Sequence, residues 1–216
     1  MSKTLLKATD IAHTFDYPLF SDIDFTLHEQ ESIAIVGRSG SGKSTLLHIF
    51  SSFIEPNSGK VELLDRDLYS LKESKVEDIR RNDLGIIFQA HYLFKGMKAI
   101  ENLEIATLLS AQTIDDELLE RLEIKETMEQ KIGELSGGQQ QRISIARVLS
   151  KKPTIIFADE PTGNLDKETA NLVMQVLLEY IKENNAAMVL VTHDESMAKL
   201  CNRSYRLENR KLEEIS

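Results

Sequence analysis

GRSGSGKS, residues Gly37 to Ser44, follows the apolar run Ile33 to Val36 and precedes a helix-like segment that contains Leu46 and Leu47. Its three glycines let the backbone bend so that successive amide N–H groups point toward anionic oxygens. The lysine supplies positive charge for the β- and γ-phosphates, and the final serine hydroxyl can ligate Mg²⁺. A strand, a glycine-rich loop and a helix in this order predict a nucleotide-binding chain. The residues expected around the phosphates are Gly37, Arg38, Ser39, Gly40, Ser41, Gly42, Lys43, Ser44 and Thr45.

A second glycine motif, LSGGQ at Leu135 to Gln139, opens the long segment QQQRISIARVLSKK. The simplest interpretation is a helix start with Ser136 as the N-cap, followed by Gly137 and Gly138. Amide groups at a helix N-terminus carry partial positive charge and attract anions. The structural and the functional interpretations therefore agree, and Ser136, Gly137, Gly138 and Gln139 are candidate phosphate contacts.

Composition limits the classes of function. A formal net charge of −9 disfavours nonspecific nucleic-acid binding, which depends on lysine and arginine. The longest purely apolar run, Ala186 to Val191, is far shorter than the roughly 20 residues that span a bilayer. No secretory signal pattern appears near Met1, and Cys201 is the single cysteine, which suits a reducing compartment. We expect a cytoplasmic chain that does not itself insert into a membrane.

Apolar and helical segments alternate along most of the chain. Ile23 to Leu27 alternates as a half-buried strand does, and Ile86 to Phe88 forms an apolar strand that ends at Gln89. Helices and strands then alternate from LSGGQ to Val191, which predicts βαβ crossovers and a mainly parallel, covered sheet. Residues 205 to 212 suggest a closing hairpin.

More motifs follow in order: Gln89, the run IIFADE ending in Asp159 and Glu160, NLD at 164 to 166, and His193 after an apolar strand. Together with GRSGSGKS and LSGGQ, they make the sequence resemble the nucleotide-binding subunits of ATP-binding cassette (ABC) transporters, almost to its end. The resemblance implies an α/β fold: a P-loop NTPase core with a mainly parallel sheet, an N-terminal antiparallel β subdomain and an inserted helical subdomain. It implies one ABC ATPase domain over 1–216, with the core at about 1–89 and 137–216 and the helical subdomain at about 90–136.

The same resemblance assigns catalytic roles. Asp159 would hold Mg²⁺ through water, with Ser44 and Gln89 also at the metal, and Glu160 would activate the attacking water as general base. Gln89 would also reach that water, and His193 would contact the γ-phosphate. Taken alone, a glutamine after a strand is usually a solvated polar residue, and an isolated histidine is more often structural.

Phe15 stands where the family places an aromatic ring against adenine. Tyrosine is more usual there, but stacking requires a π-face and not a hydroxyl. A core phenylalanine is the structural alternative at this position. Tyr17 is the second candidate for the stacking role.

In the resembling family two subunits pack head to tail, so that ATP bound by one phosphate loop is covered by Ser136, Gly137 and Gly138 of the other, with Asp166 near the seam. The resemblance thus implies an ATP-dependent homodimer that opens and closes with nucleotide turnover. The helical subdomain and the segment after Gln89, AHYLFKGMKAIENL, would form a groove for an integral membrane transporter subunit. Here Lys95, Gly96 and Met97 replace a proline-containing stretch common in relatives. The chain would then be peripheral on the inner face of the cytoplasmic membrane.

PTGNLD and a short helical insert resemble the compact branch with the lipoprotein-releasing (LolD-type), macrolide-exporter (MacB-type) and cell-division (FtsE-type) ATPases. This favours an ATPase that powers export or extraction of a lipophilic or envelope cargo. The first alternative is an FtsE-type ATPase that drives a membrane partner without moving cargo. A DNA-maintenance ATPase is a further alternative, but such proteins carry long coiled-coil or zinc-binding insertions.

Overall fold

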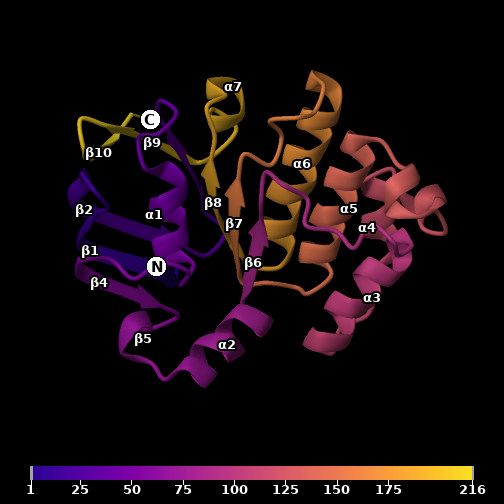
Figure 1. The fold of residues 1–216 in the computed structure, drawn as a ribbon, viewed down its shortest axis with the longest axis horizontal. Helices are drawn as coiled ribbons and strands as arrows, with labels where there is room; N and C mark the ends of the chain where they lie inside the picture. Colours follow the sequence, from indigo (N-terminus) through magenta and orange to yellow (C-terminus); the bar gives the residue numbers. More distant parts are fainter. Residues whose placement is uncertain (1, 216) are drawn as a thin grey trace.

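The computed structural model describes residues 2–215, and within them the chain forms two β-sheets flanked by helices (Figure 1). The antiparallel four-stranded sheet has the order β2-β1-β4-β5, and the six-stranded sheet has the order β10-β9-β3-β8-β7-β6. In the second sheet all neighbouring strands run parallel except the closing hairpin of β9 and β10. These features confirm the predicted α/β class with its N-terminal antiparallel sheet.

The strands are β1 (Thr4–Thr14), β2 (Pro18–His28), β3 (Ser32–Val36), β4 (Ser58–Leu63), β5 (Arg66–Asp67), β6 (Leu84–Ile87), β7 (Ile155–Asp159), β8 (Ala187–Val191), β9 (Arg203–Glu208) and β10 (Lys211–Glu214). The α-helices are α1 (Lys43–Phe50), α2 (Glu73–Asn82), α3 (Ala99–Ser110), α4 (Asp116–Arg121), α5 (Gly137–Leu149), α6 (Lys167–Glu183) and α7 (Glu195–Ala198). Three single 3-10 turns are η1 (Leu68–Ser70), η2 (Lys125–Thr127) and η3 (Ile132–Glu134).

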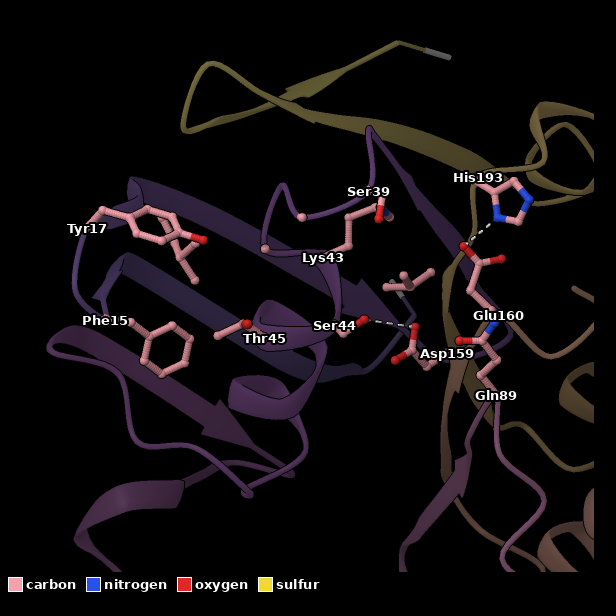
Figure 2. A pocket seen from close by; sticks show the side chains of 14 residues that line it. Phe15, Tyr17, Ser39, Lys43, Ser44, Thr45, Gln89, Asp159, Glu160 and His193 are labelled. Atoms are coloured by element: carbon pink, nitrogen blue, oxygen red, sulfur yellow. Dashed lines mark hydrogen bonds and ion pairs between the residues drawn. The ribbon is translucent and has the colours of Figure 1, made fainter.

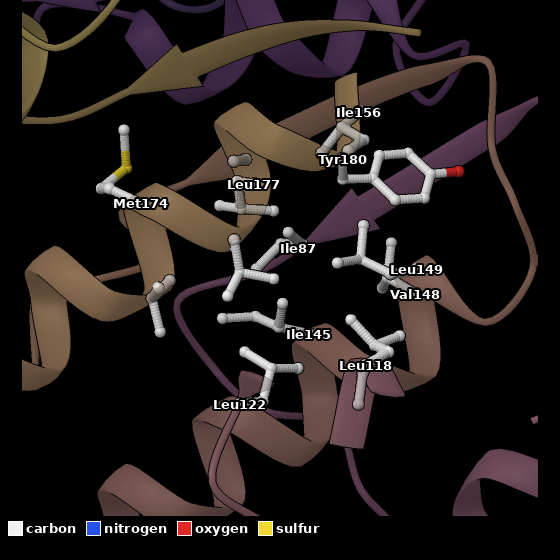
Figure 3. Close-up of a cluster of buried hydrophobic side chains, with 14 of the residues drawn as sticks. Ile87, Leu118, Leu122, Ile145, Val148, Leu149, Ile156, Met174, Leu177 and Tyr180 are labelled. Atoms are coloured by element: carbon white, nitrogen blue, oxygen red, sulfur yellow. The ribbon is translucent and has the colours of Figure 1, made fainter. Parts of the chain in front are cut away.

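The central strands are apolar on both faces because both faces of the six-stranded sheet are covered. In β7, Ile155 and Phe157 join the cluster beneath α1 and the four-stranded sheet, whereas Ile156 and Ala158 join the cluster beneath α5 and α6. Figure 3 shows the second cluster, in which Leu177 and Tyr180 of α6 approach Ile87 and Ile156. The six-stranded sheet is therefore packed on both faces. The loops that follow its parallel strands lie together at the carboxyl-terminal edge of the sheet.

The segment between Gln89 and Leu135 contains α3 and α4, but residues 90–98 form bends, turns and irregular backbone. The buried amide of Asn102 binds both the N–H and the carbonyl of Phe94, at 2.8 and 3.3 Å, which holds this stretch outside a helix. The predicted strand through Phe88 was one residue too long, because β6 pairs with β7 only as far as Ile87. The division into a core and a helical subdomain near residues 90 and 136 stays a prediction.

In the described part of the chain, no helix combines the length and apolarity that a membrane span requires.

Candidate functional site

An open cleft of about 620 Å³ lies at the carboxyl ends of β3, β7 and β8, where open α/β sheets bind ligands. Figure 2 shows aromatic side chains on one side of the cleft, with Gln89, Glu160 and His193 on the other. The cleft brings together most of the residues that the motifs predicted. Its lining comprises Phe15, Tyr17, Leu19, Ser39, Gly40, Gly42, Lys43, Ser44, Thr45, Gln89, Asp159, Glu160, Val191 and His193.

The phosphate-binding loop connects β3 to α1. Gly42 precedes the helix with a φ of 99°, and a Cβ atom there would lie 3.1 Å from the Phe20 ring, so this position requires glycine. The Lys43 ammonium folds back over the loop and donates to the carbonyls of Gly37 and Arg38, each at 3.0 Å. The Ser41 hydroxyl is buried and has no hydrogen-bond partner among the described residues.

Ser44 and Asp159 meet although 115 residues separate them, because β3 and β7 both flank β8. The Ser44 hydroxyl donates to Asp159 Oδ1 at 3.1 Å (Figure 2). Burial raises the pKa of Asp159, and the charge of Glu160 adds to that rise, whereas Ser44, His48 and Lys43 oppose it. Hydroxyl and carboxylate oxygens are the ligands that Mg²⁺ prefers, so this pair fits a magnesium site beside the phosphate loop.

Glu160 is held from three directions. Its backbone has a φ of 48°, and its N–H donates to the Val191 carbonyl at 2.9 Å. One carboxylate oxygen lies 2.8 Å from Nδ1 of His193, and the other accepts from the Thr192 hydroxyl at 3.3 Å. The Glu160 side chain is only 13% exposed, whereas that of His193 is 69% exposed. A left-handed backbone at a non-glycine residue is unusual, and here it turns the carboxylate into the cleft.

Thr192 was missed by the sequence reasoning. Besides binding Glu160, its hydroxyl accepts the N–H of Asp194 at 3.0 Å, so it connects the ends of β7 and β8. The available signal was a threonine that directly follows an apolar strand and precedes His193. Gln141 was missed as well: its buried side chain donates to the Pro161 carbonyl at 2.9 Å and joins α5 to the loop after Glu160.

Phe15 and Tyr17 both line the cleft and are 56% and 59% exposed, so Phe15 is not a core residue. The Phe15 ring packs edge to face on His13 at 4.7 Å. Either side chain therefore presents an aromatic surface beside the phosphate loop.

The LSGGQ motif begins α5, as its helix-start pattern predicts. Ser136 is the N-cap: its hydroxyl accepts from the Gln139 N–H at 3.3 Å, and the Gln139 side chain accepts from the Ser136 N–H at 2.9 Å. None of Ser136, Gly137, Gly138 or Gln139 lines the cleft of the same chain. The chain thus carries a second set of anion-attracting amides, largely exposed and outside its own site.

Asp166 also lies outside the cleft, as the exposed N-cap of α6. Its carboxylate accepts from the N–H groups of Glu168 and Thr169, each at 3.0 Å, and from the Thr169 hydroxyl. Gly37, Arg38 and Ser41 belong to the phosphate loop but do not line the cleft.

Comparison with known families and proteins identifies the family of this chain. The family model described as "ABC transporter" matches residues 20–163. The lipoprotein-releasing system ATP-binding protein LolD of Shewanella oneidensis is 41% identical, over 88% of this chain and 86% of that protein. LolD of Leptospira interrogans is 36% identical, over 94% of this chain and 88% of that protein.

Solved structures agree as well. The dimeric ATP-binding cassette MJ0796 in a post-hydrolysis state with ADP and phosphate superimposes with a TM-score of 0.89, at 31% identity and 98% coverage of both chains. CbiO1 of Clostridium perfringens superimposes with a TM-score of 0.85 over 97% of this chain and 86% of that one. Because the two sequences are only 24% identical, this similarity supports the fold and nothing further.

Proposed function

The chain belongs to the ABC transporter family, and from this premise we propose that it is the ATP-hydrolysing subunit of a lipoprotein-releasing transporter. Two copies would close on ATP, and hydrolysis would reopen them. The lipoprotein-releasing assignment is supported by the LolD relatives. No relative reported above favours the cell-division type, in which the ATPase moves no cargo.

One observation carries the proposal of a shared site. A single copy places the phosphate loop, Gln89, Asp159, Glu160 and His193 in one cleft, yet its LSGGQ segment lies elsewhere, with Ser136 and Gly137 exposed. A second copy in head-to-tail orientation would bring Ser136, Gly137 and Gly138 over that cleft, with Asp166 near the seam. The dimeric cassette MJ0796 supports this arrangement.

The cleft residues divide the chemistry as follows. The loop amides and Lys43 bind the β- and γ-phosphates, and Phe15 stacks on the base, with Tyr17 as the second candidate. Glu160 accepts a proton from water, whose oxygen attacks the γ-phosphorus as the bond to the bridging oxygen of ADP breaks. His193 and Thr192 hold the Glu160 carboxylate at the distances reported above, and Gln89 faces the same space.

Ser44, Asp159 and Gln89 are the residues that would hold Mg²⁺. When bound, the ion neutralises charge on the phosphate oxygens. Without the ion, Asp159 would be a partly buried carboxylate of raised pKa beside the carboxylate of Glu160. The donor set therefore suits a cation there.

The partner would be an integral membrane subunit that receives the dimer's motion through a groove formed by the helical subdomain and the segment after Gln89. Attachment to that subunit would place the chain on the inner face of the cytoplasmic membrane.

The test is Glu160→Gln, which keeps the shape of the side chain but removes the base. We expect ATP hydrolysis to fall by roughly a hundredfold to ten-thousandfold while ATP still binds, so that the dimer accumulates. Light scattering with ATP and with ADP measures the dimer, and phosphate release measures turnover.

Lys43→Ala in the same background is the matched control, because it weakens phosphate binding and should abolish the ATP-dependent dimer. Undiminished turnover in Glu160→Gln would remove Glu160 from its role. If Glu160→Gln stayed monomeric at every ATP concentration, the proposal that two copies share each ATP site would be contradicted.

A further inference from the structure

His13 is a buried histidine whose ring has no polar partner. It lies near the end of β1 and is 5% exposed. Both ring nitrogens are buried without a hydrogen-bond partner among residues 2–215. Burial lowers the pKa of His13, which keeps the ring neutral at pH 7. A buried N–H group without an acceptor lowers stability, so an aliphatic side chain would suit folding better at this position.

The ring contacts of His13 are with two phenylalanines. The Phe15 ring packs on it with centroids 4.7 Å apart and an interplanar angle of 84°. On β2 the cross-strand neighbour of His13 is Phe20, whose ring centroid is 6.4 Å away. Phe15 is exposed in the cleft, whereas Phe20 is buried. The imidazole therefore lies between a ring of the cleft and a ring of the core.

The backbone on either side of His13 is held by Asn57, which precedes β4. The Asn57 side chain accepts from the Thr14 N–H at 2.6 Å, and the Asn57 N–H donates to the Ala12 carbonyl at 3.0 Å. Phe15, in contrast, lies just beyond the end of β1 and exposes more than half of its surface. The contact with His13 thus gives an exposed side chain a fixed neighbour.

We propose that His13 is a positioning residue for nucleotide binding, which holds the Phe15 ring in the orientation that stacks on the base. This inference rests on the proposed function, because it places the base at Phe15, across the cleft from Glu160 (Figure 2). Ordering an exposed ring before the ligand arrives removes part of the entropy cost of binding. The contact also favours Phe15 over Tyr17, because Tyr17 has no such aromatic pair within the described chain.

A second route leads from His13 to the phosphate loop through Phe20. Gly42 lies so close to Phe20 that a Cβ atom there would be 3.1 Å from the ring. The centroid distance from His13 to Phe20 is longer than that to Phe15, however, and Phe20 is buried in the sheet core in any case. The geometry assigns His13 to the base, and two ligands separate the routes: ADP, and inorganic pyrophosphate, which has no base.

The experiment measures the binding of ADP and of pyrophosphate to the full chain by calorimetry. His13→Leu removes the flat ring together with the unpaired nitrogens, so this variant is expected to fold. We expect ADP to bind about threefold to tenfold more weakly, while pyrophosphate binding stays within about 1.5-fold. In ATP hydrolysis the KM should rise with kcat unchanged. His28→Leu is the matched control, because His28 ends β2 outside the cleft, and it should change neither affinity.

Two further variants test whether the effect passes through Phe15. In a Phe15→Ala background, His13→Leu should not weaken ADP binding any further, because the ring that it positions is already missing. His13→Phe restores a flat ring and should return ADP binding to within about twofold of normal. If His13→Leu does not fold, His13→Met takes its place, since an unbranched side chain fills irregular space.

Unchanged ADP binding in His13→Leu would overturn the proposal. An equal loss of pyrophosphate binding would also overturn it, because His13 would then act on the phosphate loop. So would a further loss in the Phe15→Ala background, or a folded His13→Phe that binds ADP as weakly as His13→Leu does. If the unmodified chain bound neither ADP nor ATP, the proposed function itself would fail, whereas nucleotide binding that is independent of His13 would leave that function intact.

Discussion

Asp159 lies at the end of β7, partly buried beside Glu160 and 3.1 Å from the Ser44 hydroxyl. Because burial raises its pKa, the folded chain binds this proton more tightly than the unfolded chain does. The group therefore favours folding below its ordinary pKa of 3.8, and that contribution is lost as the pH rises through the folded pKa. At neutral pH the ionised carboxylate is a cost to stability that metal binding would offset.

Asp159→Asn should accordingly raise the unfolding midpoint of the nucleotide-free chain at pH 7, by roughly 2–4 °C for each kcal/mol gained in a chain of this size. The difference in unfolding midpoint from the unmodified chain should narrow as the pH is lowered toward the ordinary aspartate pKa of 3.8. Mg²⁺-dependent turnover should be lost. Thermal unfolding at several pH values measures the first effect. If Asp159→Asn unfolded at a lower temperature than the unmodified chain at pH 7, the ionised Asp159 carboxylate would not be a cost to stability.

At the scale of elements, α6 is connected to the central sheet by apolar packing and by one buried hydrogen bond. The Tyr180 hydroxyl donates to the Pro153 carbonyl at 3.0 Å, just before β7 carries Asp159 and Glu160 to the cleft. The alternation of helices and strands after LSGGQ predicted this helix, and in the structure Val173, Leu177 and Ile181 share its buried face. The same pattern could not indicate which loop the Tyr180 hydroxyl reaches.

Tyr180→Phe removes that donor and leaves a buried carbonyl unpaired. We expect a loss of about 1–3 kcal/mol of unfolding free energy, with turnover per folded molecule nearly unchanged. Denaturant unfolding measures the loss, and Tyr17→Phe, an exposed tyrosine, is the control for stability. An unchanged unfolding free energy would mean that the Pro153 carbonyl is satisfied in another way.

At the scale of the whole molecule, the proposed enzyme is incomplete in one copy. The cleft and the N-terminus of α5 belong to the same chain but not to the same site. A heterodimer of Lys43→Ala and Ser136→Arg would contain one site with both defects and one site with neither.

We therefore expect each variant to be inactive alone and their equal mixture to recover up to roughly a quarter of normal turnover, because half of randomly paired dimers are mixed and each has one intact site of two. Phosphate release from the mixture, measured across protein concentrations, checks this. A mixture as inactive as its components would count against sites shared between copies.

The local parts could be predicted from the amino-acid sequence: the phosphate loop, the helix start at Ser136 and the apolar strands. Each is set by neighbouring residues, because glycine φ angles, N-caps and side-chain period act over a few positions. Only the folded chain reveals that the Ser44 hydroxyl donates directly to Asp159 and that Thr192 supports Glu160. Those contacts depend on strand order and helix packing, which bring together residues that no local spacing relates.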